Sequence, residues 1–94
     1  MKSRAKEVRD HLRSLGELVN EWDPAGLLAA GAPKSEYECL IPSLYARLAE
    51  PEQDMQQLLE WLTLEVQGHF GIAPMRTGEF VRKARGWYEK RRGV

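Results

Sequence analysis

Apolar residues recur every three to four positions along most of this chain, which is the pattern of amphipathic helices. The first such segment runs from about Ser3 to Glu21. Its apolar stripe consists of Val8, Leu12, Leu15, Val19 and Trp22. Charged residues such as Arg9, Arg13 and Glu17 fall on the opposite side. We expect a helix that packs one face against a core.

A second helix is predicted from Ser35 to about Ala49. Its apolar positions in helical register are Tyr37, Leu40, Ile41, Leu44, Tyr45 and Leu48. Ser35, with Glu38 three residues later, has the pattern of a capping box at a helix start. Pro42 lies beyond the first turn, where it removes a backbone hydrogen bond and crowds the preceding turn. We therefore expect a kink, or a short first piece, near Pro42.

The third predicted helix covers about Pro51 to Gln67 and is apolar on two sides. Its main stripe is Met55, Leu58, Leu59, Leu62 and Val66. Trp61 and Leu64 lie on another face. The helix is therefore either central to the bundle, or it offers a second apolar patch through which Trp61 and Leu64 form a homodimer. We favour the central position and, with it, a monomer.

Gly68 or Gly71 is expected to end this helix, with Phe70 of the following connector in the core. The last helix is predicted from Thr77, as its N-cap, to about Arg92. Its inward side chains are Phe80, Val81, Ala84, Trp87 and Tyr88. Its outward side chains are basic, namely Arg82, Lys83, Arg85, Lys90 and Arg92. This segment is a clear amphipathic helix with a basic outer face.

The stretch between Trp22 and Pro42 interrupts the periodicity. Asp23 is expected to cap a restarting helix, and Pro24 suits its first position. Gly31 suits the left-handed conformation that ends such a segment. The sequence therefore predicts one all-α domain over all 94 residues. We expect a compact bundle of about four helices, plus a short capped turn after the first.

Composition is ordinary for a globular domain, with 43% hydrophobic and 30% charged residues. Cys39 is the single cysteine, so an internal disulfide is excluded. We interpret Cys39 as a small, partly buried side chain. No apolar run has the length of a membrane span, and the polar first residues do not resemble a signal peptide. A cytoplasmic protein is the simplest interpretation.

Charge is distributed unevenly although the net charge is zero. Residues 1–14 carry five basic and two acidic side chains, residues 15–75 carry two and ten, and residues 76–94 carry seven and two. The three segments therefore have net charges of +3, −8 and +5. An acidic middle indicates either a basic partner or basic chain ends that fold over it.

Titratable residues form no pattern that predicts catalysis or a cofactor. Glu65 and His69 stand four apart, as two metal ligands can, but no third ligand accompanies them. His11 lies at the edge of the first apolar stripe, where a half-covered ring is a structural feature. The chain has no phosphate-binding glycine loop and no nucleophile paired with a base. We therefore expect no enzyme, no metal and no cofactor.

The segments LVNEWDPAGLL, SEYECLIPSLYARL and FVRKARGWYEKR together resemble the YugE-like family of small bacterial proteins. The family pattern is a helix that ends in E-W-D-P-x-G, a loop, and an acidic-Tyr-acidic start to the next helix. Its motif residues in this chain include Trp22, Asp23, Pro24 and Gly26. The likeness covers about residues 15 to 92, with a longer loop in this chain. It implies an all-α fold of about four helices and no assigned activity.

Three function classes fit these features. We favour a non-enzymatic protein-interaction module, for example an immunity or antitoxin-like protein, whose acidic patch binds a basic partner. The candidate contact residues are Asp23, Glu36, Tyr37 and Glu38. As an alternative for these positions, the glutamates only favour the helix dipole and Tyr37 belongs to the core. The second class is nucleic-acid binding by the basic C-terminal helix, and the third is an enzyme that uses these carboxylates and a histidine.

Overall fold

The computed structural model describes residues 4–50 and 54–92, and its regular elements within these ranges are all helical. They are α1 (Arg4–Trp22), a 3-10 helix η1 (Lys34–Leu40), α2 (Ile41–Leu48), α3 (Met55–Phe70) and α4 (Thr77–Arg92). The predicted all-α bundle of about four helices is confirmed. Among the described residues, none of these helices is long and apolar enough to cross a bilayer.

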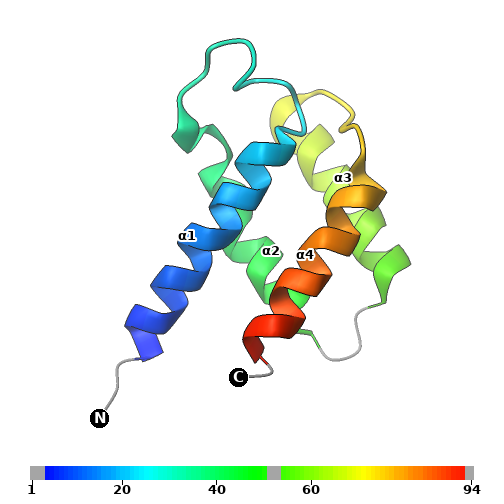
Figure 1. Ribbon diagram of the computed structural model, residues 1–94. Helices are drawn as coiled ribbons and strands as arrows, with labels where there is room; N and C mark the ends of the chain where they lie inside the picture. Colours follow the sequence, from blue (N-terminus) through cyan, green and yellow to red (C-terminus); the bar gives the residue numbers. More distant parts are fainter. Residues whose placement is uncertain (1–3, 51–53, 93–94) are drawn as a thin grey trace.

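The four α-helices alternate in direction along the bundle (Figure 1). α1 packs against η1 and α2, α3 packs against α4, and α2 contacts both later helices. The first turn of α1 and the last turn of α4 therefore lie at one end of the molecule (Figure 1). The loops at 23–33 and 71–76 lie at the opposite end.

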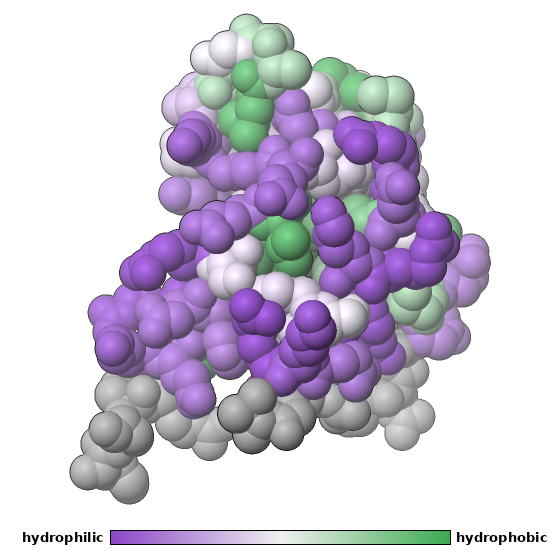
Figure 2. All heavy atoms as spheres, in the orientation of Figure 1, coloured by the Kyte–Doolittle hydropathy of each residue, from purple (hydrophilic) through white to green (hydrophobic). Residues whose placement is uncertain are grey.

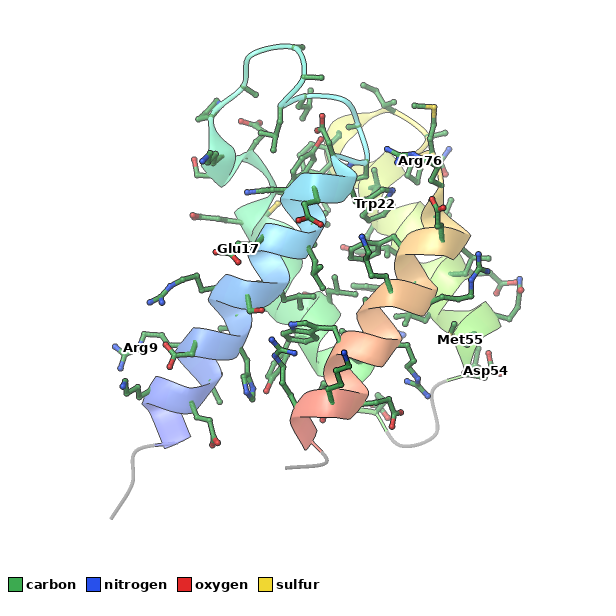
Figure 3. The ribbon with its side chains drawn as sticks, in the orientation of Figure 1. Arg9, Glu17, Trp22, Asp54, Met55 and Arg76 are labelled. Atoms are coloured by element: carbon green, nitrogen blue, oxygen red, sulfur yellow. The ribbon has the colours of Figure 1, made fainter. Side chains whose placement is uncertain are left out.

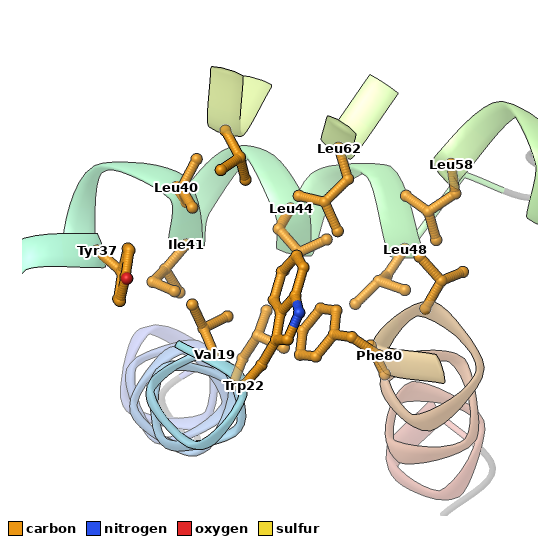
Figure 4. Packing of buried hydrophobic residues seen from close by; sticks show 14 of the residues in the cluster. Val19, Trp22, Tyr37, Leu40, Ile41, Leu44, Leu48, Leu58, Leu62 and Phe80 are labelled. Atoms are coloured by element: carbon orange, nitrogen blue, oxygen red, sulfur yellow. The ribbon is translucent and has the colours of Figure 1, made fainter. Parts of the chain in front are cut away.

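A single hydrophobic core joins all four α-helices. Figure 4 shows Val19 and Trp22 of α1, leucines of α2 and α3, and Phe80 of α4 in this core. Trp22, at the end of α1, stacks on Phe80 with 4.2 Å between ring centroids. Ring pairs of this kind stabilise a fold beyond the area that they bury. The inward positions predicted for α4 are confirmed, because Phe80, Val81, Ala84 and Trp87 are buried and the half-buried Tyr88 packs against the core.

The second predicted helix is divided into η1 and α2, which confirms the expected short first piece before Pro42. The predicted capping box is wrong. Pro33 is the residue before η1, and no side chain caps this helix. The amide of Glu36 already bonds the carbonyl of Pro33 at 3.1 Å, so the tighter 3-10 turn closes before Ser35 can act as a cap.

The third helix begins later and ends later than the sequence predicted. Asp54 has an extended backbone and accepts the N–H of Gln57 at 2.7 Å, so it is the N-cap of α3. The predicted start at Pro51 lies outside the described residues. Gly71, with φ of 70°, ends the helix, and Phe70 is its last residue. The Phe70 ring packs edge-on against Tyr37 with 5.2 Å between centroids.

The prediction that α3 is covered on both of its apolar faces is wrong for the face that carries Leu64. Leu64 is 67% exposed, whereas Trp61 is half-buried with the Arg47 guanidinium 4.8 Å from its ring centroid. Two residues assigned to apolar stripes, Val8 and Met55, are also exposed because each lies in the first turns of its helix, beyond the neighbours that would cover it. The homodimer through Trp61 and Leu64 stays a prediction.

The outer surface is mainly hydrophilic on the face shown in Figure 2. Hydrophobic residues on that face gather at the end formed by the two loops (Figure 2). In the 71–76 loop, Ile72 is 44% and Met75 is 67% exposed. Cys39 is exposed as well, which corrects its predicted partial burial, because it lies on the outer side of η1.

Candidate functional site

Asp23 ends α1 in a left-handed conformation, with φ of 49°. Its N–H donates to the Val19 carbonyl at 2.8 Å, the bond that closes a helix when the next residue turns left-handed. Aspartate tolerates this conformation better than most residues, because its short side chain can bond locally. The predicted role of Asp23 as the N-cap of a short helix is therefore wrong.

The Asp23 carboxylate instead closes the loop that follows. It accepts the N–H groups of Leu28 and Ala29, both at 3.0 Å, which are five and six residues further on. The segment after Asp23 consists of turns rather than helix. Gly26 and Gly31 have φ of 70° and 102°, so the left-handed conformation predicted for Gly31 is confirmed.

The Tyr37 hydroxyl also binds this loop and contacts the Asp23 carboxylate. It donates to the Asp23 carboxylate at 2.5 Å and accepts the N–H groups of Ala25 and Leu27 at 3.1 and 3.2 Å. We call Asp23, Ala25, Leu27 and Tyr37 the Asp23–Tyr37 network. This network fixes the loop by hydrogen bonds from one side chain of η1 and one residue that ends α1.

The network shifts the pKa of both of its titratable groups, the Asp23 carboxyl and the Tyr37 hydroxyl. Burial alone would raise the pKa of the Asp23 carboxyl, but hydrogen bonds from the Tyr37 hydroxyl and from loop amides outweigh it and lower that pKa below its ordinary value. Burial and the hydrogen bond to Asp23 raise the pKa of the Tyr37 hydroxyl. At neutral pH Asp23 is therefore a carboxylate that accepts a hydrogen bond from the neutral phenol of Tyr37. This arrangement stabilises the loop.

A second set of contacts ties the end of α1 to the 71–76 loop. The Trp22 indole N–H donates to the Met75 carbonyl at 2.5 Å, and the Arg76 guanidinium donates to the Trp22 carbonyl at 3.3 Å. Figure 3 shows Trp22 and Arg76 near each other at this end of the bundle. A buried indole N–H requires an acceptor, but this acceptor is 53 residues away and has no local signature in the sequence.

The four predicted contact residues separate into two kinds. Tyr37 is 1% exposed, so its ring has no surface to offer to a partner, and the alternative that placed it in the core is confirmed. The Asp23 carboxylate is half-buried and bonded within the network. Glu36 and Glu38 are exposed on η1. Only these two glutamates stay available from the predicted patch.

A groove of about 600 Å³ lies between α1 and the η1–α2 segment, and we call it the α1–η1 groove. Its lining residues on α1 are Leu12, Arg13, Gly16, Glu17 and Asn20. Those on the other wall are Lys34, Ser35, Tyr37, Glu38, Ile41 and Pro42. The sequence did not reveal this groove, because the two walls are brought together only by the turn of the chain at 23–33.

The two walls of the groove run in opposite directions (Figure 1). The Asn20 amide donates to the Lys34 carbonyl at 3.2 Å and marks one end. Leu12, Gly16 and Glu17 line the groove from α1, and Glu38 and Pro42 line it from the other wall. Glu17 projects from α1 on the side of η1 and α2 (Figure 3). The groove lining thus includes one glutamate and one basic residue on each wall, Glu17 with Arg13 and Glu38 with Lys34.

A polar and aromatic cluster joins α1, α2 and α4. The half-buried His11 ring bonds the Tyr45 hydroxyl at 2.9 Å, and the Trp87 indole donates to the Ser14 hydroxyl at 2.9 Å. Arg91 also reaches Ser14, at 3.2 Å, and its guanidinium lies 4.5 Å from the Trp87 ring centroid. Because these groups bond one another, they explain how α1 and α4 associate rather than indicating a reactive site.

Glu65 and His69 meet at 3.2 Å on the surface of α3. This is the ordinary contact of an i, i+4 pair on a helix. Among residues 4–50 and 54–92, no group of three or more histidine, cysteine or acidic side chains is placed to hold a metal ion. The pair is therefore explained as a local hydrogen bond between side chains one helical turn apart.

One contact between a basic chain end and the acidic middle is the pair of Lys83 of α4 and Glu21 of α1, 3.7 Å apart. Other basic residues belong to the turns where α1 begins and α4 ends, which lie at the same end of the bundle (Figure 1). These include Lys6, Arg9, Lys90 and Arg91.

Comparisons of the chain with protein-family models, with curated proteins and with solved structures gave no match. The resemblance to the YugE-like family stays a prediction.

Proposed function

We propose that this protein is a non-enzymatic interaction module that binds a basic protein partner through the exposed carboxylates around η1. The observation that carries the proposal is the environment of Glu17, Glu36 and Glu38. All three are exposed, and no ion pair joins any of them to a cation in the described residues. Unpaired carboxylates held on short, well-packed elements favour association with a basic surface.

Internal bonding of Asp23 argues against the catalytic alternative. The Asp23 carboxylate receives three hydrogen bonds from its own chain, and its pKa is lowered. A general acid or base at neutral pH needs a pKa near the working pH and a free path to substrate. Asp23 meets neither requirement, so we assign it to the fold.

The partner class that suits these carboxylates is a protein with a basic site, which extends the proposal to an immunity or antitoxin-like role in the cytoplasm. Such a protein works by covering a basic functional surface on its target. Complementary charge on the two surfaces speeds their association and excludes wrong partners. The rate of association should accordingly fall as salt is added.

Reversing the charge of the exposed pair tests this proposal. A tagged chain that carries Glu36→Lys and Glu38→Lys is compared with wild type for capture of its cellular partner, after circular dichroism has shown equal helicity. The control is Glu50→Lys with Glu60→Lys, an equal charge change at exposed positions of the other half of the chain. We expect partner capture to be lost with the first variant only. Equal capture by both variants would remove the proposal.

Nucleic-acid binding is a second candidate because the basic start of α1 and the basic end of α4 lie at the same end of the bundle (Figure 1). A positive cluster of this kind attracts phosphates in a salt-dependent way. If this candidate is right, Lys90→Glu with Lys6→Glu should abolish retention on heparin at low salt. Retention that is weak in wild type, or unchanged in the variant, would exclude it.

A further inference from the structure

We propose that two copies of this chain associate through α3, with the two helices antiparallel and a twofold axis close to Leu64. The proposal goes beyond the proposed function, because the surface that it uses contains no residue of η1. We call this surface the outer α3 face. Its residues are Gln57, Glu60, Trp61, Leu64, Gln67, Gly68 and Gly71, and all of them are exposed except the half-buried Trp61.

Leu64 lies on the side of α3 that points away from the core. A helix turns about 100° per residue, so Leu64 is about 160° around the helix from Leu62 and from Val66. Those two side chains are fully buried, whereas Leu64 is 67% exposed. Covering an exposed leucine removes apolar surface from water and favours association. In the twofold pair each Leu64 is covered by the outer α3 face of the other copy.

The outer α3 face is complementary in shape to itself when the two helices run antiparallel. Trp61 lies about one turn before Leu64 and Gly68 about one turn after it, on the same side of the face. The twofold axis therefore sets Trp61 of each copy opposite Gly68 of the other. A Cβ built on Gly68 meets nothing within 4 Å. The largest side chain of the face thus meets a position that has none.

Polar residues on the other side of the face also match in this orientation. Glu60 and Gln67 lie about one turn before and one turn after the axis, so each Glu60 carboxylate faces a Gln67 amide of the other copy. Glu60 accepts the Gln56 amide at 3.0 Å, and a carboxylate has capacity for further donors. Parallel helices about a twofold axis would instead set Trp61 opposite Glu60 and leave Gly68 beside Gln67. The face therefore selects the antiparallel pair.

A second copy is the partner that fits, because each half of the outer α3 face is complementary to the other half. Such an interface is isologous, as in the twofold dimers that are commonest among soluble oligomers. One helix pair buries less than the roughly 800 Å² per partner of a standard interface. We therefore expect a weak dimer, with a dissociation constant of about 10 to 100 µM.

Sedimentation equilibrium of the whole 94-residue chain tests the proposal at about 5 to 500 µM, a range that spans the expected dissociation constant. The mass should rise from 10.8 kDa toward twice that value as the concentration increases. Leu64→Glu sets two carboxylates against each other at the axis, so this variant should stay monomeric. Met75→Glu is the matched control, because Met75 is also 67% exposed but lies in the 71–76 loop, and it should dimerise as wild type. A wild type that stays at 10.8 kDa, or equal masses for the two variants, would overturn the proposal.

Substitutions at Gln67 and Gly68 test the orientation of the pair. Gln67→Lys brings an ammonium to Glu60 of the other copy and should tighten the dimer about threefold, the scale of one exposed ion pair, whereas Gln67→Glu should weaken it by a similar factor. Gly68→Leu fills the position opposite Trp61 and should abolish dimerisation. Gly16→Leu, at a helical glycine of α1 with equally open space, is its control and should dimerise as wild type. Weakening by both Gln67 variants, no effect of either, or equal dimerisation of the two leucine variants would contradict the antiparallel α3 pair.

Discussion

Tyr37 and its neighbours Glu36 and Glu38 are adjacent in the sequence but lie in opposite environments. Tyr37 is 1% exposed and binds the loop after α1, whereas both glutamates are exposed. A 3-10 helix turns about 120° per residue, so a residue between two exposed ones points away from them. In this short motif the aromatic residue therefore serves the fold, and the two acids serve the surface.

The carboxylates of Asp23 and Glu38 differ in the same way. Asp23 receives three hydrogen bonds from its own chain, and its pKa is lowered. Glu38 lines an open groove and forms no ion pair with the described residues. An acidic residue is thus available to a partner only where its carboxylate does not already accept hydrogen bonds from its own chain. The sequence alone does not show which acidic residues these are.

Replacing Asp23 should have the largest effect on stability. Asp23→Ala places a residue that disfavours left-handed backbone at φ of 49° and removes the acceptor for Tyr37, Leu28 and Ala29. We expect a loss of about 2 to 4 kcal/mol in the free energy of unfolding, measured in urea. A loss below about 0.5 kcal/mol, the range of surface substitutions, would place Asp23 with the exposed acids.

Removing the Tyr37 hydroxyl should have the next largest effect. Tyr37→Phe keeps the buried ring but leaves the N–H groups of Ala25 and Leu27 without their acceptor. We expect a loss of about 1 to 3 kcal/mol, together with faster hydrogen exchange at these two amides. Tyr45→Phe, at a half-buried position that bonds His11, is a matched hydroxyl deletion and should leave exchange in this loop unchanged.

Acid should weaken the network only at low pH. Because the folded-state pKa of Asp23 is lowered, its contribution to stability is complete above the unfolded pKa and is lost as the pH falls through the folded one. The stability difference between wild type and Asp23→Asn should therefore be constant from about pH 7 to pH 5 and shrink below about pH 4. A difference that already shrinks near pH 6 would show that this carboxylate is not held as an anion.

Neutralising the exposed acids should change stability least. Glu36→Gln and Glu38→Gln alter side chains that bond no described cation, so each should change the free energy of unfolding by less than about 0.5 kcal/mol. Thermal unfolding of both variants beside wild type measures this. A clear loss in either would show that the fold uses these acids and would weaken their assignment to a partner.

Helical periodicity predicted the fold well because burial of one stripe decides where each helix forms. The inward positions of α4 and the break near Pro42 follow directly from spacing and from the backbone chemistry of proline. Helix boundaries were less accurate, since Asp54 rather than the sequence near Pro51 caps α3. Exposure of Leu64 was missed because periodicity shows that a face is apolar but not that a neighbour covers it.

The site was predicted only in part, because its geometry depends on contacts between distant residues. Glu36 and Glu38 were identified correctly as exposed acids, but the bond between Tyr37 and Asp23 spans 14 residues and has no local signature. The groove also depends on the return of the chain at 23–33, which places Glu17 opposite a segment that follows it by about twenty residues.

The most direct test of the separation between fold and surface is a pair of double-mutant cycles measured by urea unfolding. The first cycle combines Asp23→Asn with Tyr37→Phe, and the second combines Asp23→Asn with Glu38→Gln. Residues in direct contact couple by about 0.5 to 3 kcal/mol, and independent ones add within about 0.5 kcal/mol. We predict coupling above 1 kcal/mol in the first cycle, at roughly the middle of that range, and additivity in the second. Additivity in the first cycle, or equal coupling in both, would contradict the account.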